Sequence, residues 1–139
     1  MANRREIVLD SIKDGDVVYV TACSQCASKA KITVTGLEQD IVLEKNHERT
    51  APEELTCQCK FSKYISKKEG QEDNKKVKLI IDIFNEDNQM RVIKSASIMS
   101  DKEGHEKGIN FAFHIDDQAE GDSDFNDYCI NISTFHTQG

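Results

Sequence analysis

Four oxygen-bearing side chains follow one another closely near the end of the chain: Asp122, Asp124, Asn126 and Asp127. Calcium is a hard cation that takes about six to eight oxygen ligands. Alternate residues of a turning loop can direct such oxygens toward one point. Without a cation, carboxylates this close together would repel one another and raise one another's pKa values. The segment therefore predicts a calcium site, and a merely solvated acidic loop is the alternative.

An EF-hand is excluded by the residues that follow. Asp122, Asp124 and Asn126 match its first three ligand positions, but the sixth position is Asp127 where the loop needs Gly. The twelfth position is Ser133 where the loop needs Glu, and it lies in a predicted strand. A calcium site here belongs to a loop between β-strands.

The negative charge is concentrated in the same part of the chain. The formal net charge is −7, and residues 108–139 hold six of the 25 acidic residues but none of the 18 Lys and Arg. Nucleic-acid binding needs a basic patch, so this distribution argues against it. It favours a metal cation as the partner of the C-terminal segment.

The elements that must position these residues follow a period of two, which is typical of β-strands. The chain is short enough for one domain, residues 1–139, and no window predicts a helix. Charged, Gly-containing stretches at 63–76 and 100–108 are predicted loops. We therefore expect an all-β fold, a small antiparallel β-sandwich. The predicted strands cover residues 7–9, 16–22, 31–35, 40–44, 77–84, 90–99, 110–115 and 128–135.

The ends of the chain show no targeting segment. No apolar run has the length of a signal peptide or a membrane span. The sequence predicts a chain that is cytoplasmic as synthesised and does not insert into membranes. Release to the cell surface or outside by a non-classical route stays open.

Asn110-Phe111-Ala112, an acidic loop, Asp122-Ser123-Asp124-Phe125-Asn126-Asp127 and a strand ending near Gly139 form a recognisable order. It resembles the calcium-mediated bacterial lectins of the PA-IIL (LecB) type. The segment from Val20 to Lys29 is similar to the strand and loop that border the sugar site in that family. The resemblance covers both ends of the chain but not the middle.

The resemblance implies a β-sandwich lectin that holds mannose or fucose through two adjacent calcium ions. Vicinal sugar hydroxyls would bind the ions, and Cys26, Ala27 and Ser28 would border the sugar with Asp122, Asp124 and Asp127. The family also needs an upstream acid. Because the loop length departs from the family pattern, Glu120 and Asp117 compete for that role, and Glu120 is preferred. The implied metal ligands are Glu120, Asp122, Asp124, Asn126, Asp127, Gln25 through its backbone, and the carboxylate of Gly139 from a neighbouring subunit.

The cysteines allow a second metal. Cys23, Cys26, Cys57 and Cys59 can form a four-thiolate zinc site, although the Cys-x-Cys half departs from the usual spacing. Reduced thiols or disulfides are the alternatives. Cys129 alternates with apolar residues in the last strand, which predicts a packed thiol. The four histidines have no ligand-like spacing.

Three functions are therefore considered. The first is a calcium-dependent lectin, a binding module and not an enzyme, that binds mannose- or fucose-containing glycans as a homodimer or higher homo-oligomer. The second is a structural calcium-binding β-domain for adhesion or assembly, without a sugar site. The third is a zinc-stabilised interaction protein. A glycosidase is disfavoured because the acids crowd one loop.

Overall fold

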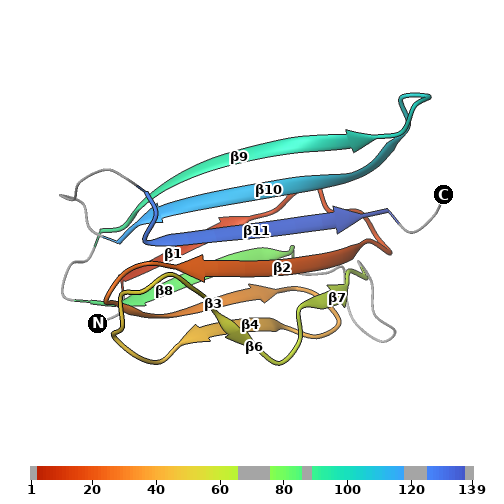
Figure 1. Ribbon diagram of the computed structural model, residues 1–139. Coiled ribbons are helices and arrows are strands. Elements are labelled where there is room, and N and C mark those ends of the chain that lie inside the picture. Colours follow the sequence, from red (N-terminus) through yellow and green to blue (C-terminus); the bar gives the residue numbers. More distant parts are fainter. Residues whose placement is uncertain (1–2, 66–75, 86–88, 118–124, 137–139) are drawn as a thin grey trace.

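The computed structural model describes residues 3–65, 76–85, 89–117 and 125–136. Two antiparallel sheets pack face to face, as Figure 1 shows, and this confirms the predicted all-β sandwich. The first sheet has the strand order β1-β8-β3-β4-β6. The second has the order β5-β2-β11-β10-β9, with β7 also paired to β2. The strands are β1 (Asn3–Val8), β2 (Val17–Ser24), β3 (Lys29–Thr35), β4 (Ile41–Lys45), β5 (Glu53–Glu54), β6 (Thr56–Cys57), β7 (Phe61–Lys63), β8 (Lys78–Phe84), β9 (Arg91–Ser100), β10 (Glu106–Asp116) and β11 (Tyr128–Phe135).

The core between the sheets is formed by the apolar side chains that alternate with polar ones along each strand. Successive side chains of a strand point to opposite faces, so every second residue of β2, β8 and β11 turns inward. Burying one large apolar side chain stabilises the fold by about 1.5–3 kcal/mol. The largest fully buried side chains include Phe113, Tyr128, Leu79, Ile81, Ile130 and Ile132.

The observed strands match most of the predicted ones, with three main differences. Strand β1 covers Asn3–Val8, so the strand predicted at residues 7–9 begins four residues too late. The loop before β10 spans only residues 101–105, because β10 begins at Glu106, so the predicted loop 100–108 is too long. The short strands β5, β6 and β7 were not predicted. Of the predicted loop 63–76, residues 66–75 lie outside the described residues. Within the described residues no helix is long and apolar enough to cross a membrane.

Strand β9 forms one edge of the second sheet and is largely exposed on both faces. Its register with β10 places Lys94, Ala96 and Ile98 on the inner face, opposite Phe113, Phe111 and Ile109. These three β9 side chains are nevertheless exposed, Ile98 by 64%. The first sheet therefore does not cover β9.

A histidine at the end of β11 joins three parts of the second sheet. His136 Nδ1 lies 2.7 Å from Asp16 Oδ1, and its Nε2 lies 2.6 Å from Glu106 Oε2. Asp16 is buried in the turn before β2, where it also accepts a hydrogen bond from the Lys13 backbone N–H at 2.8 Å. The carboxylates of Asp16 and Glu106 raise the pKa of His136.

This contact predicts a pH-dependent contribution to stability. Because the folded-state pKa of His136 lies above the unfolded value of about 6.5, its contribution is fully present below about pH 6.5. It is lost as the pH rises through the folded-state value. We expect His136→Gln to lower the free energy of unfolding by about 1–3 kcal/mol at pH 5.5, with a smaller loss at pH 9, measured by urea denaturation. The control is His105→Gln, which changes a mostly exposed imidazole. If His136→Gln lowered the free energy of unfolding equally at both pH values, the prediction would be wrong.

Candidate metal centre

Three carboxylates meet where β10 ends and β11 begins. Asp116 is the last residue of β10, Asp117 follows it, and Asp127 directly precedes β11. The antiparallel register pairs Ile115 with Tyr128, so it brings these strand ends together. One ligand oxygen of each Asp lies within 4.8 Å of the others. Asp127 was predicted as a ligand, Asp117 as the less favoured upstream acid, and Asp116 was not predicted.

Asp117 is held from several sides. Its backbone N–H donates to Asp127 Oδ2 at 2.9 Å, and Ser28 Oγ donates to its Oδ2 at 2.7 Å. Its carbonyl oxygen accepts hydrogen bonds from the side-chain amides of Asn3 at 3.2 Å and Asn85 at 2.9 Å. Strand β1 and the residue after β8 therefore hold the backbone of Asp117, and the β2–β3 loop holds its carboxylate.

Asp116 has a counter-ion within the fold. Its side chain is only 2% exposed and forms an ion pair with Arg91 of β9. The Arg91 guanidinium also lies 5.3 Å from the ring centroid of Phe125, which has a φ of 52°. Arg91 therefore connects a buried carboxylate to the segment that leads into Asn126 and Asp127.

The remaining negative charge acts on Asp127. The pKa of Asp127 is raised to about 7, chiefly by desolvation and in addition by the charges of Asp117 and Asp116, while the hydrogen bond from the Asp117 N–H opposes the rise. An ordinary Asp carboxyl has a pKa near 3.9. At neutral pH this centre is therefore predisposed to take up a positive charge, either a proton or a cation.

The β2–β3 loop lies beside the three carboxylates. The Gln25 N–H donates to the carbonyl oxygen of Asp127 at 3.1 Å, and the Asn126 side-chain amide is 3.5 Å from Gln25 Oε1. Ala27 is exposed and Ser28 half-buried, while the Cys26 thiol is buried in the core. Of the predicted sugar-binding side chains in this loop, Ala27 and Ser28 therefore reach the surface and the Cys26 side chain does not.

A buried lysine forms hydrogen bonds to the backbone of this loop. Lys45 is only 3% exposed, and its ammonium group donates to the carbonyl oxygens of Cys26 and, at 3.2 Å, Ser28. The Tyr128 hydroxyl donates to the same Ser28 carbonyl. Sequence reasoning missed Lys45 because it ends an ordinary alternating strand, where a lysine is usually solvated.

Four of the predicted ligands, Glu120, Asp122, Asp124 and Gly139, lie outside the described residues. Among the described residues, the predicted ligand Asn126 is exposed beside Asp127.

Asn85 is a candidate oxygen ligand that was not predicted. Its Oδ1 atom is buried and accepts no hydrogen bond in the described part of the chain, while its Nδ2 atom donates to Asp117.

A second acidic group, Asp101, Glu103 and His105, has a structural explanation. It lies in the β9–β10 turn, at the other end of β10. Asp101 Oδ1 accepts hydrogen bonds from the backbone N–H groups of His105 at 2.9 Å and Glu103 at 3.0 Å. These bonds lower the pKa of Asp101, the His105 bond most of all. This carboxylate stabilises the turn.

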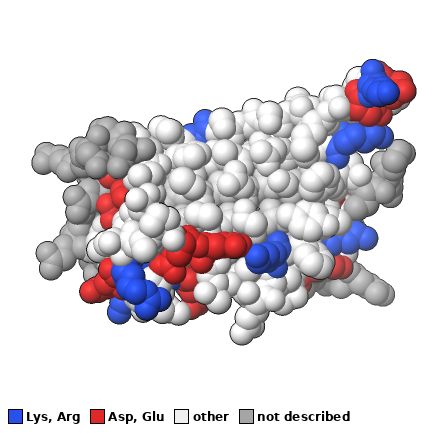
Figure 2. Space-filling view, in the orientation of Figure 1, with Lys and Arg blue, Asp and Glu red and all other residues white. Residues whose placement is uncertain are grey.

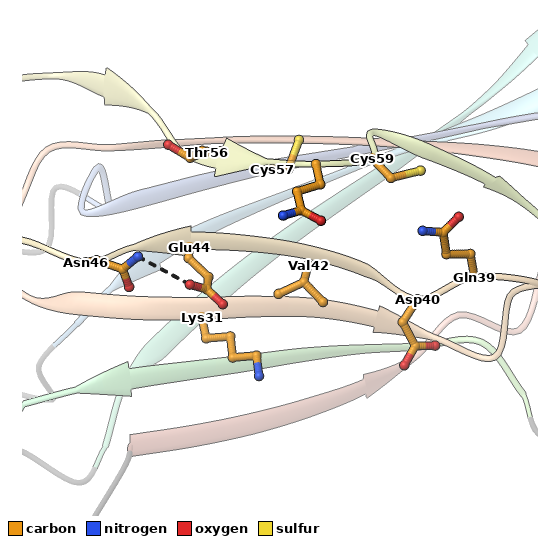
Figure 3. Close-up of a pocket in the computed structure, with 10 residues that line it drawn as sticks. Lys31, Gln39, Asp40, Val42, Glu44, Asn46, Thr56, Cys57 and Cys59 are labelled. Atoms are coloured by element: carbon orange, nitrogen blue, oxygen red, sulfur yellow. Dashed lines mark hydrogen bonds between the residues drawn. The ribbon is translucent and has the colours of Figure 1, made fainter.

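The four cysteines considered for zinc are not brought together. Cys23 is exposed on β2 and Cys26 is buried in the core. Cys57 and Cys59 line a hollow of about 440 Å³ on strands β3, β4 and β6, shown in Figure 3. The Cys59 thiol donates to the Phe61 carbonyl at 2.8 Å. The hollow holds Lys31, Glu44 and Asn46 but none of the three clustered aspartates.

Neither a scan against protein-family models nor a search among curated proteins finds a match to this chain. The lectin resemblance therefore rests on the sequence motif alone.

The electrostatics of the centre predict the effect of removing one carboxylate. In the wild type, calcium at a hundredfold excess over its Kd should raise Tm by about 5–10 °C, because that excess contributes about 2.7 kcal/mol. Asp127→Asn should lose most of this shift. Without metal it should be at least as stable as the wild type at pH 8, because the repulsion is removed. Differential scanning calorimetry measures both effects. Asp101→Asn is the matched control, and retention of the full shift by Asp127→Asn would refute the assignment.

Proposed function

We propose that this protein is a calcium-dependent lectin that binds mannose- or fucose-type sugars beside Asp117, Asp127 and the β2–β3 loop. The convergence of Asp116, Asp117 and Asp127 at one point carries the proposal. In the described part of the chain Asp117 and Asp127 form no ion pair with a basic residue, and burial and mutual repulsion disfavour a third negative charge there. A bound divalent cation would relieve that repulsion.

The donor set fits calcium better than a softer metal. The group contains carboxylate oxygens alone, with amide oxygens of Asn126 and Asn85 nearby and no histidine or cysteine in the described cluster. Oxygen-only sites suit calcium and magnesium, whereas zinc and copper favour nitrogen and sulfur. Asp117, Asp127 and Asn126 would hold the first ion. The lectin resemblance adds Asp122, Asp124 and a second ion.

The loop beside the centre supports a sugar site. Ser28 connects Asp117 through its hydroxyl to Lys45 and Tyr128 through its carbonyl. The neighbouring Ala27 and Gln25 are exposed on the same loop. A sugar whose vicinal hydroxyls bind the cation would contact this rim, and a loop fixed in advance loses little entropy on binding.

Titration calorimetry tests the proposal directly. We expect mannose or fucose to bind with calcium present, to lose binding after EDTA and to regain it when calcium is restored. Asp127→Asn should abolish the heat, whereas Asp101→Asn should keep it. No heat with either sugar, on protein that binds calcium, would reject the lectin function.

A structural calcium-binding β-domain is the second candidate. It is favoured by the way Asp117 joins β1, β8 and the β2–β3 loop, because a cation there would fasten several strand ends together. In the lectin proposal the Gly139 carboxylate of one protomer completes the metal site of its partner in a homodimer. A structural domain has no such requirement.

A C-terminal extension separates the two candidates. A short tag after Gly139 should weaken sugar binding at least about tenfold if the terminal carboxylate is a ligand, because a charge-assisted contact contributes about 1.5–3 kcal/mol. The same tag before Met1 is the control. If the extended protein binds sugar as tightly as the control, Gly139 is not a ligand. If neither tagged form binds sugar but both show the calcium-induced rise in Tm, the structural domain is favoured.

A further inference from the structure

Three potential metal ligands form a row across the outer face of the second sheet. The strand register pairs Cys23 of β2 with Cys129 of β11, and Cys129 with His114 of β10. Cys23 and His114 are exposed and Cys129 is half-buried. Cys129 was predicted as a packed thiol, but it lies on the face opposite to Tyr128 and Ile130, which fill the core.

This face is accessible and nearly uncharged. Figure 2 shows that its broad middle carries no Lys, Arg, Asp or Glu, with the charged side chains gathered toward its margins. The next residue along the row, Glu54 of β5, is engaged by Lys60 at 2.7 Å. A positive ion that binds the row would therefore meet no described basic side chain in the middle of the face.

Cys129 and His114 already lie at the spacing of two ligands. Cys129 Sγ is 3.4 Å from His114 Nδ1. In a tetrahedral zinc site, with Zn–S near 2.3 Å and Zn–N near 2.0–2.1 Å, sulfur and nitrogen are about 3.6 Å apart. The observed spacing, which is that of a hydrogen bond, is about 0.2 Å shorter than this value.

The pairing of Cys23 with Cys129 also favours a shared metal. Gln25 and Asp127 lie opposite each other, two residues beyond the pair Cys23 and Cys129, and the Gln25 N–H donates to the Asp127 carbonyl oxygen at 3.1 Å. Hydrogen-bonded pairs recur at every second residue, so Cys23 and Cys129 are such a pair, with Cα atoms about 5.5 Å apart. Their Cβ atoms are then wider apart than the 3.5–4.5 Å or so of a disulfide. Two thiolates on one zinc need sulfur atoms only about 3.8 Å apart.

We propose that Cys23, Cys129 and His114 form a binding site for a tetrahedral zinc-class cation, with water as the fourth ligand. The exposed Cys23 side chain closes the site by rotating toward the other two ligands. Binding releases the two thiol protons to solvent, so two thiolates balance a divalent ion and the imidazole binds in its neutral form.

Ligand chemistry keeps this site distinct from the carboxylate cluster nearby. Thiolate and imidazole select zinc and related metals, whereas carboxylates select calcium. The proposal therefore does not depend on the lectin function, and either can fail without the other. It also replaces Cys26, Cys57 and Cys59 as partners of Cys23.

Cobalt(II) is a suitable probe, because thiolate ligands give it a charge-transfer absorption in the near ultraviolet that oxygen ligands do not. The full chain, reduced, stripped with chelator and saturated with calcium, should bind one cobalt with this absorption. Zinc should displace the cobalt. Cys23→Ser and Cys129→Ser should each weaken zinc binding more than about 100-fold, beyond the 10–100-fold typical of losing a neighbouring supporting residue. His114→Ala should weaken cobalt and zinc binding, although both thiolates remain.

Cys57→Ser and Cys59→Ser are the matched controls and should bind cobalt as the wild type does. Circular dichroism of each variant confirms that the sheet structure is retained, and His114→Gln gives a second test of the imidazole. No thiolate absorption in the wild type would overturn the proposal. So would an absorption that is undiminished in both Cys23→Ser and Cys129→Ser, or a Cys23–Cys129 disulfide in protein purified without oxygen.

Discussion

The register of β11 is the constraint on which both candidate sites depend. This strand lies between β2 and β10, and side chains alternate between its two faces. Tyr128 and Ile130 turn inward, so Cys129 must turn outward, and Asp127 enters the strand beside Asp117. A shift of one residue would bury Cys129 and expose Tyr128. The large apolar cost of that shift keeps both groups of polar ligands in place.

Two cationic side chains lie at the carboxylate cluster and the loop beside it. Arg91 neutralises the buried Asp116, and the ammonium group of Lys45 fixes the carbonyl oxygens of the neighbouring loop. Burying a charge without partners is costly, so both cations are held by several contacts at once. These contacts hold the groups around the cluster in place, so Asp117 and Asp127 are the carboxylates without a fixed counter-ion among the described residues. A cation that bound there would change the net charge of the cluster more than its shape.

Much of the fold could be predicted from the sequence, because alternation is a local property. Strands such as β8 and β11 have alternating apolar residues over seven or eight positions, and their predicted limits agree with the observed ones within one residue. The strands β5, β6 and β7 have only two or three residues each, too few for a period to be seen. Asp127 was predicted from its neighbours in sequence. The roles of Asp116 and Lys45 and the pairing of Cys129 with His114 depend on which strands are adjacent, and local alternation does not reveal that.

The uncovered inner face of β9 has a consequence for solubility. A long edge strand with unpaired backbone groups is a template for the edge of another molecule, and exposed apolar side chains such as Ile98 strengthen that tendency. Lys94 lies in the middle of this inner face, two residues from Ala96. An inward-pointing charge opposes edge-to-edge pairing with another molecule. Lys94, on the uncovered face of β9, therefore works against association of two molecules along this edge.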